Sequence, residues 1–256
     1  MKYTFYRYLF LCAALALSAA CSAPIENVSR SPVPNIYGPM IDGDIRLPEV
    51  DLQYLREPNR RSEVIYSGYE PAGTIVVDPY AKFLYFIEAP GRATRYPIAV
   101  GRDGRGFRGR ATIQHRAEWP GWTPTKNMLR TEPEIYGPFA RGIPGGIASP
   151  LGARALYLYR GGRDTRYRIH GTSNFKSIGN ASSAGCIRMF NQDVIHLFDR
   201  APNGTKVIVR SYEESVAAEG YEMANRGVDL PPEIVNPEDI YAAVEAEKQR
   251  RATLSE

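Results

Sequence analysis

The chain has 256 residues, of which 43% are hydrophobic, and its 32 Lys and Arg against 28 Asp and Glu give a formal net charge of +4. This length allows one sizeable domain with tails, and the mild charge does not indicate nucleic acid as a partner. No nucleic-acid motif accompanies the arginines. We therefore expect no nucleic-acid partner, and we expect most arginines to form a solvated face, with a few near a cleft free to hold an anionic substrate.

Residues 1–20 have the pattern of an export signal. Lys2 and Arg7 precede the apolar run Leu9–Leu17, which is too short for a membrane span of roughly 20 residues. We therefore exclude this segment from the fold.

Cys21 follows the small residues Ser18, Ala19 and Ala20, which resemble the lipobox of bacterial lipoproteins. The resemblance implies that Cys21 carries a lipid as the first residue of the mature chain, and Ser22 after it favours the outer membrane. Cleavage by an ordinary signal peptidase after Ala20 or Ala23 is the alternative. The expected location is the periplasm, with the chain anchored to the inner face of the outer membrane.

The rest of the chain divides into three predicted parts. Residues 22–61 are rich in Pro and Asn and predict an extended tether that holds a catalytic domain away from the membrane. Residues 62–211 form the predicted domain. Residues 212–256 form a charged tail with a helix at 237–251, which either docks on the domain or lies in solvent.

Short strands separated by Gly and Pro dominate the predicted domain. Residues 74–78 and 82–87 flank Asp78-Pro79-Tyr80-Ala81, a turn with proline at its second position, and therefore predict a β-hairpin. Further strands are predicted at 94–100, 111–117, 155–159, 167–170 and 205–210. The fold class is mainly β and sandwich-like, with one or two short helices and long loops.

Two other segments stand out in this domain. The aromatic-containing loop 119–150 predicts an ordered lid or wall over a cleft, although packing beneath the sheet is the alternative. Residues 191–198 predict one short helix that Asn191 caps. We expect His196, within that helix, and His115, on a strand, to be structural residues.

Cys186 is the candidate nucleophile. Cys12 is lost with the signal and Cys21 is expected to carry lipid, so Cys186 has no partner for a disulfide in an oxidising compartment. A thiol attacks a carbonyl as the thiolate and needs a base or a cationic neighbour. His170, sixteen residues earlier, is the candidate base.

The strand that ends at His170 predicts how the base is presented. Alternation places Tyr167 and Ile169 on one face and Arg168 and His170 on the other. The imidazole also needs an acceptor on its second nitrogen, and the carbonyl of Gly171 is the local candidate. The backbone N–H groups of Gly185 and Cys186 are expected to stabilise an oxyanion.

These residues resemble a known family. The matching segments are His170-Gly171-Thr172, Ser177-Ile178-Gly179 and Ser183-Ala184-Gly185-Cys186-Ile187-Arg188-Met189, together with Trp122-Thr123-Pro124-Thr125 and the stretch 144–152. Over residues 73–209 the chain resembles the L,D-transpeptidase catalytic domain, of the YkuD type, of bacterial cell-wall enzymes.

The resemblance implies an activity on peptidoglycan peptide stems. Cys186 attacks the carbonyl of the third residue of a tetrapeptide stem, D-alanine leaves, and an amine of a second stem resolves the thioester into a 3–3 cross-link. His170 is implied as general base and acid, oriented by Gly171, with Gly185 as an oxyanion donor. The implied substrate-binding residues are Arg188, which holds a stem carboxylate or the motif loop, Ser183, Thr172 and Trp122. No metal and no cofactor are implied.

One residue departs from the family pattern. Many members carry histidine where this chain has Ala184, so a mechanism in which that histidine handles the acceptor's proton does not apply. The acceptor itself stays open. Water would make the protein an L,D-carboxypeptidase or a hydrolase that releases a protein from the wall, and a lysine amine would make it an enzyme that attaches an envelope lipoprotein.

Readings outside this reaction are also open. The lipid anchor, tether and basic surface fit a non-catalytic lipoprotein that binds peptidoglycan, although such a protein has no need of a thiolate. A papain-like protease is disfavoured because the cysteine follows the histidine. A metal site built from Cys186 and the histidines is poorly supported by their spacing.

Overall fold

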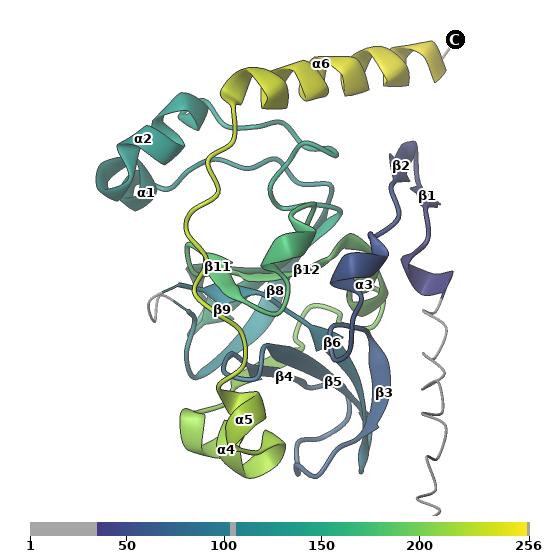
Figure 1. Cartoon of the computed structure of the whole chain (residues 1–256), viewed down its shortest axis with the longest axis vertical. Coiled ribbons are helices and arrows are strands. Elements are labelled where there is room, and N and C mark those ends of the chain that lie inside the picture. Colours follow the sequence, from purple (N-terminus) through teal and green to yellow (C-terminus); the bar gives the residue numbers. More distant parts are fainter. Residues whose placement is uncertain (1–34, 103–105, 255–256) are drawn as a thin grey trace, which may run out of the picture. The chain divides into compact units, whose positions relative to one another are not determined.

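The computed structural model describes residues 35–102 and 106–254, which lie in one compact unit (Figure 1). The expectations for residues 1–34, including the signal peptide and the lipid on Cys21, lie outside the described residues. The expected mainly β fold is confirmed. A nine-stranded mixed sheet has the strand order β12-β10-β9-β8-β13-β4-β5-β6-β3. Its strands are β3 (Ser62–Ile65), β4 (Ile75–Asp78), β5 (Phe83–Ala89), β6 (Arg92–Pro97), β8 (Arg110–Glu118), β9 (Arg154–Arg160), β10 (Arg163–Thr172), β12 (Ile187–Phe190) and β13 (Lys206–Val209).

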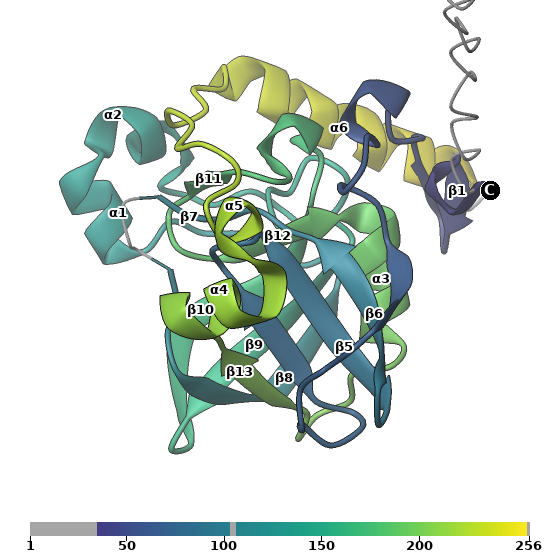
Figure 2. The ribbon, with the colours of Figure 1, turned by 60° about the horizontal axis from the view of Figure 1, so that its bottom comes forward.

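The sheet bends so that its two halves share one core (Figure 2). A bridge between Ala99 and Arg188 joins the chain after β6 to β12 at the far edge of the sheet. The buried side chains of both halves therefore meet, which gives the expected sandwich-like arrangement. Members of this core include Ile75, Leu84, Tyr96, Ile113, Leu156, Ile169, Ile187 and Val207. A small parallel pair, β7 (Val100–Gly101) with β11 (Ala181–Ser183), lies beside this closure.

The predicted hairpin is present and its turn is held by one carboxylate. β4 pairs antiparallel with β5, and Asp78 Oδ1 accepts hydrogen bonds from the N–H groups of Tyr80 (3.1 Å) and Ala81 (2.8 Å). An aspartate at the first position of a turn stabilises the turn, because its side chain accepts hydrogen bonds from the backbone N–H groups that follow it. The turn predicted from the Asp-Pro pair is therefore confirmed.

The structure differs from the expected tether over residues 35–61. This segment contains η1 (Asn35–Tyr37), β1 (Met40–Asp42), β2 (Ile45–Leu47) and η2 (Leu52–Tyr54), of which β1 and β2 pair antiparallel. Tyr37, Val50 and Leu55 are buried against Ile178 and Phe190 of the domain. The prolines do punctuate the segment, but its scattered apolar side chains have a surface on which to pack, and burying them favours docking over extension.

Three helices follow the last strand. α4 (Tyr212–Glu219) and α5 (Tyr221–Ala224) were not expected, although Ser211 and Glu214 form a capping box that can be read from the sequence. α6 (Pro237–Leu254) confirms the helix expected at 237–251. The C-terminal tail is therefore largely helical.

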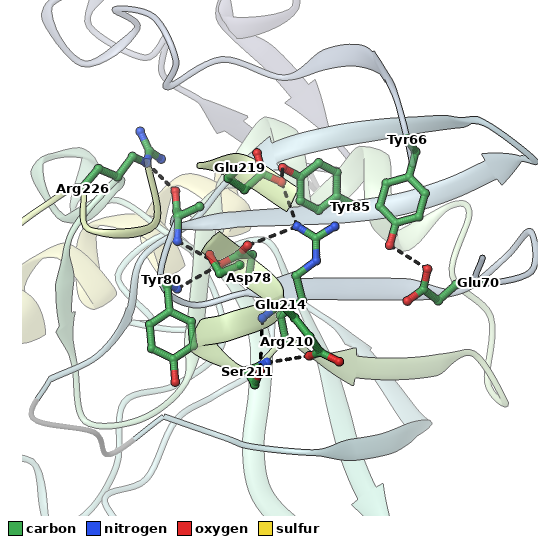
Figure 3. Close-up of polar contacts among 12 residues, drawn as sticks. Tyr66, Glu70, Asp78, Tyr80, Tyr85, Arg210, Ser211, Glu214, Glu219 and Arg226 are labelled. Atoms are coloured by element: carbon green, nitrogen blue, oxygen red, sulfur yellow. Dashed lines mark hydrogen bonds and ion pairs between the residues drawn. The ribbon is translucent and has the colours of Figure 1, made fainter. Parts of the chain in front are cut away.

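A buried polar cluster, the docking network, holds α4 against the sheet (Figure 3). Asp78 accepts from Ser215 Oγ (2.8 Å) and from Arg210 Nη1 (3.1 Å). Arg210 Nη1 also donates to Glu219 Oε1 (2.7 Å), which in turn accepts from the Tyr85 hydroxyl (2.7 Å). Burial acts to lower the pKa of Arg210, but its bonds to Glu219 and Asp78 outweigh burial and raise it.

α3 (Asn191–Phe198) confirms the helix predicted over the same residues, but Asn191 does not cap it. Its Oδ1 instead accepts from the Ala153 N–H (2.9 Å). The structural role expected for His196 is borne out, because its Nδ1 is 2.7 Å from the Tyr96 hydroxyl. His115 on β8 packs against the Tyr157 ring. Among the described helices, none has both the length and the apolar character needed to cross a membrane.

Candidate active site

The catalytic face is set by the pairing of β10 with β12. These strands run parallel, with Ile169 opposite Ile187 and His170 opposite Arg188. Ile169 and Ile187 lie in the core, so alternation turns His170 and Arg188 to the other face. The predicted division of the β10 side chains is therefore confirmed, and Cys186, one residue before β12, lines the same cleft as His170.

The cleft over this face has a volume of about 680 Å³. Its size lies within the range of small-molecule sites. The loop 119–150, with α1 (Lys126–Thr131), α2 (Pro133–Tyr136) and η3 (Gly137–Phe139), forms one wall, as expected of a lid. Trp122 lines this wall and packs against the rings of Tyr136 and Phe139. The distances between ring centroids are 6.2 Å to Tyr136 and 6.4 Å to Phe139.

His170 is buried and oriented by the backbone, as predicted. Its Nδ1 is 2.7 Å from the Gly171 carbonyl oxygen. A carbonyl only accepts, so Nδ1 carries the proton and Nε2 is left as the base. Burial is the main cause that lowers the pKa of His170, to about 3, and the charge of Arg188 adds to it. The imidazole is therefore neutral at neutral pH.

Gly171 is required for space as well as for its carbonyl. A Cβ at this position would lie 2.1 Å from Asn191 Oδ1 and 3.1 Å from the Ala153 nitrogen. Asn191 cannot simply turn away, because its Oδ1 accepts the Ala153 N–H. Any larger residue would therefore displace the carbonyl that orients the base.

Cys186 is half-buried, and its thiol is also neutral at rest. Burial is the main cause that raises the pKa of Cys186, against a lowering contribution from the Arg168 backbone N–H. The sulfur lies 4.0 Å from the Arg166 carbonyl oxygen, which is its hydrogen-bond partner within the described residues. The thiol and the imidazole are therefore both uncharged at neutral pH.

An irregular stretch of β10 places that carbonyl. The register between β10 and β9 shifts between Asp164 and Arg168, and Arg166 has a left-handed φ of 67°. The Asp164 carboxylate accepts from the Arg166 N–H (2.8 Å) and from Arg168 Nη1 (2.7 Å). Such bulges re-aim backbone groups near active sites, and this one also pairs the charge of Arg168.

Ser183 lines the cleft, where it is expected to contact substrate, and its hydroxyl also holds the turn before Cys186. Ser183 Oγ donates to the Cys186 carbonyl (2.6 Å) and accepts the Gly185 N–H (3.0 Å). Gly185 has a φ of 141°, a conformation that side chains disfavour. The Gly185 N–H is therefore engaged in the turn rather than free for an oxyanion, and the Cys186 N–H is the donor nearest the thiol.

Thr172, also expected to bind substrate, has a structural contact as well. It is buried at the end of β10 and lines the cleft, but its Oγ1 accepts the Asn174 N–H (3.1 Å). That bond holds the chain as it leaves the strand. We therefore describe Thr172 as a residue that positions the loop after His170.

Arg188 is the cationic residue of the cleft that lacks a close carboxylate. Within residues 35–102 and 106–254, Arg102 pairs with Glu132 (3.2 Å) and Arg168 pairs with Asp164 (2.7 Å), whereas no carboxylate oxygen lies within 4.0 Å of the Arg188 guanidinium. Its buried Nε has no hydrogen-bond partner there. Burial lowers the pKa of Arg188, and the largest opposing charge is that of Glu233.

Several cleft residues were not found from the sequence. Arg102 directly follows β7, and Pro232, Glu233 and Ile240 come from the C-terminal tail. Only the Pro231-Pro232 pair signalled an extended segment there, and nothing in the pattern placed it at the cleft. In the described ranges, no group of three or more His, Cys, Asp or Glu side chains is arranged to hold a metal ion.

Comparisons with known proteins identify the family of this domain. A family model described as the L,D-transpeptidase catalytic domain matches residues 72–209, more than half of the chain. The probable L,D-transpeptidase ErfK/SrfK of Escherichia coli strain K12 is 35% identical over 136 residues, which cover 52% of this chain and 42% of that protein. The protein of the same name in Salmonella typhimurium is 34% identical over 151 residues, which cover 57% of this chain and 47% of that protein. The matches therefore span less than half of either relative.

One solved structure has a higher sequence identity to the chain than these two relatives. It comes from Brucella melitensis, is described as a probable carnitine operon oxidoreductase, and is 48% identical over 62% of this chain and 98% of its own, with a TM-score of 0.42. A TM-score this low supports no conclusion about activity.

Proposed function

Because the chain belongs to the L,D-transpeptidase catalytic domain family, we propose that it is a peptidoglycan L,D-transpeptidase with Cys186 as its nucleophile. One observation carries the proposal. Cys186, the backbone-oriented His170 and Arg188, which has no close carboxylate among the described residues, line one cleft at the adjacent parallel strands β10 and β12. A base, a thiol and an anion-binding group in this arrangement suit acyl transfer from an acidic peptide.

The first half-reaction forms a thioester. The Cys186 sulfur attacks the carbonyl of the third stem residue while its proton passes to His170 Nε2. The Cys186 N–H is placed to donate to the developing oxyanion, a contribution of about 3 kcal/mol for a well-placed donor. The C–N bond to D-alanine then breaks, and the imidazolium returns the proton to the departing amine.

The second half-reaction transfers the acyl group. An acceptor amine attacks the thioester, His170 takes a proton from it, and the sulfur leaves and is reprotonated as the thiol. Because Ala184 stands where many relatives carry histidine, His170 is the only imidazole we assign to this step. The side-chain amine of a second stem gives a 3–3 cross-link.

Arg188 has a specific task in this scheme. It lies opposite His170 in the strand register, so the leaving group that His170 protonates lies next to its guanidinium. The carboxylate of D-alanine is only two bonds from its amine. We assign Arg188 to that carboxylate, whose charge would satisfy the buried cation.

The location rests on residues outside the described part of the chain. The signal pattern of residues 1–20 and the lipobox resemblance at Cys21 support export and a lipid anchor at the inner face of the outer membrane. Labelling cells with a radioactive fatty acid tests the anchor. A Cys21→Ala chain should be exported but unlabelled, and a labelled Cys21→Ala chain would exclude this anchor.

Incubating the purified chain with disaccharide-tetrapeptide and measuring the product masses tests the function. Cross-linked dimers and released D-alanine are expected, whereas tripeptide alone would assign a carboxypeptidase. The matched variant Cys186→Ser, which keeps the side-chain size, should lose at least about 10³-fold in rate. Full turnover by that variant would exclude the thiol as nucleophile.

A further inference from the structure

The segment that joins α5 to α6 crosses the edge of the cleft. We call residues 228–236 the C-terminal strap. Figure 1 shows it running from α5 past β11 to α6. It pairs with β11 through two backbone bonds, from Ala181 N–H to the Val228 carbonyl (3.0 Å) and from Leu230 N–H to the Ala181 carbonyl (2.8 Å). Its path beside the cleft is therefore fixed by the backbone.

The strap presents one carboxylate to the cleft. Glu233 lines the cleft, is exposed, and accepts a hydrogen bond from the Asn174 side-chain amide. Its charge acts on Arg188, where it is the largest influence opposing burial, although the two groups are not within ion-pair distance. Glu233 therefore partly offsets the cation that has no close partner.

We propose that Glu233 is a specificity-determining residue that competes with a donor carboxylate for Arg188. This inference rests on the proposed function. A donor that binds its carboxylate at Arg188 takes over the electrostatic role of Glu233 and brings a second negative charge near the first. Glu233 therefore weakens the binding of anionic donors selectively, and it leaves donors without that charge unaffected.

The place of Glu233 in the chain fits this role. Its neighbour Ile234 is exposed and Pro232 is half-buried. The strap is held at its start by β11 and at its end by α6, whose Tyr241 hydroxyl donates to the Gly142 carbonyl in the lid (3.3 Å). An exposed side chain between two anchored ends can yield to a ligand without disturbing the fold. The chemistry of His170 and Cys186 does not depend on it.

The test compares two donor tetrapeptides that differ in one group, a C-terminal D-alanine and a C-terminal D-alaninamide, on the full chain. Replacing Glu233 with Gln should lower KM for the carboxylate donor about fivefold, the upper range for a partly exposed charge pair, with kcat unchanged. KM for the amide donor should not change. Glu238→Gln, an exposed change at the start of α6, is the matched control and should alter neither.

The outcomes separate this inference from the proposed function. An unchanged or higher KM for the carboxylate donor in Glu233→Gln would overturn the role of Glu233, and so would equal shifts for both donors, which would indicate a simple effect on the cleft wall. Wild-type turnover that depends on Cys186 would still stand in each case. No Cys186-dependent release of D-alanine from the carboxylate donor by the wild type would instead overturn the proposed function.

Discussion

Arg188 and Arg210 are both partly buried arginines at the sheet, yet their surroundings are opposite. Arg210 contacts two carboxylates, and these contacts raise its pKa despite burial. Arg188 has no carboxylate within 4.0 Å in the described chain, and burial lowers its pKa. A paired buried charge holds elements together, whereas an unpaired one is a cost to stability that a ligand can relieve.

The same contrast extends to the surrounding groups. In the docking network, Asp78 accepts from two backbone N–H groups, a serine and an arginine, and none of its oxygens is without a partner among the described residues. At the cleft, by contrast, the Ser182 hydroxyl and the Nε atoms of Arg102 and Arg188 are buried without a hydrogen-bond partner among the described residues. The cleft face therefore leaves polar atoms free to bond to a ligand, whereas the docking network satisfies the oxygens of Asp78 internally.

Breaking the docking network should give the largest effect on stability. Asp78→Ala leaves Arg210 buried with Glu219 as its one remaining carboxylate, and it removes the acceptor of the β4–β5 turn. We expect a loss of about 4 kcal/mol in the free energy of unfolding, measured with urea. Asp51→Ala, an exposed aspartate whose bonds go to Gln53, is the control and should leave stability unchanged. A small effect of Asp78→Ala would remove the distinction between the two regions.

Removing the unpaired arginine should instead affect activity without lowering stability. In Arg188→Met an apolar side chain of similar length replaces a buried cation, so the free energy of unfolding should stay the same or rise. Loss of the charge-assisted bond to substrate should reduce kcat/KM about 100-fold. Arg163→Met, an exposed change on the same strand β10, should alter neither quantity. Marked unfolding of Arg188→Met would mean that Arg188 is structural, like Arg210.

The smallest predicted effect concerns the pH dependence of stability. The pKa of His170 is about 3 in the folded protein and about 6.5 in the unfolded chain, so the unfolded chain binds the additional proton. The contribution of the neutral imidazole is complete above pH 6.5 and is lost as pH falls toward 3. As pH falls from 6 to 4, the free energy of unfolding of the wild type should decrease by about 1.4 kcal/mol per pH unit more than that of the His170→Asn variant.

Urea unfolding at pH 6, 5 and 4 measures this difference, and equal slopes for the two proteins would contradict the low pKa. The subtraction also cancels the contribution of His196, whose pKa burial lowers to about 4 in both proteins. The kinetic counterpart is that kcat/KM should not fall as pH decreases through 6.5, because the imidazole stays unprotonated.

The orientation of the candidate base could be predicted because its signals are local. The strand alternation around His170 separated its face from Ile169, and the carbonyl that orients the imidazole belongs to the next residue, Gly171. The hydrogen bonds between Ser183, Gly185 and Cys186 could not be predicted, because they close a tight turn whose geometry depends on a left-handed glycine. A sequence motif identifies such residues, but it does not show which hydrogen bonds they form.

Packing decided the remaining differences. Residues 35–61 were expected to extend as a tether, but Tyr37 and Leu55 are buried on the domain. Proline content sets the stiffness of a free segment and does not reveal whether a surface is available for its apolar residues. The capping box at Ser211 was a readable signal for α4, whereas its docking through Asp78 joins residues more than a hundred positions apart.

The sequence by itself determined the mainly β fold and the carbonyl that orients the imidazole, and it singled out Cys186 and His170 as candidates, because strand period and backbone neighbours are local properties. The tertiary structure alone decided that the thiol and the imidazole are both neutral, that Arg188 has no close carboxylate among the described residues and that Glu233 lies at the cleft. Burial and charge environment are sums over distant segments. They exist only when the sheet has closed and the C-terminal strap has paired with β11.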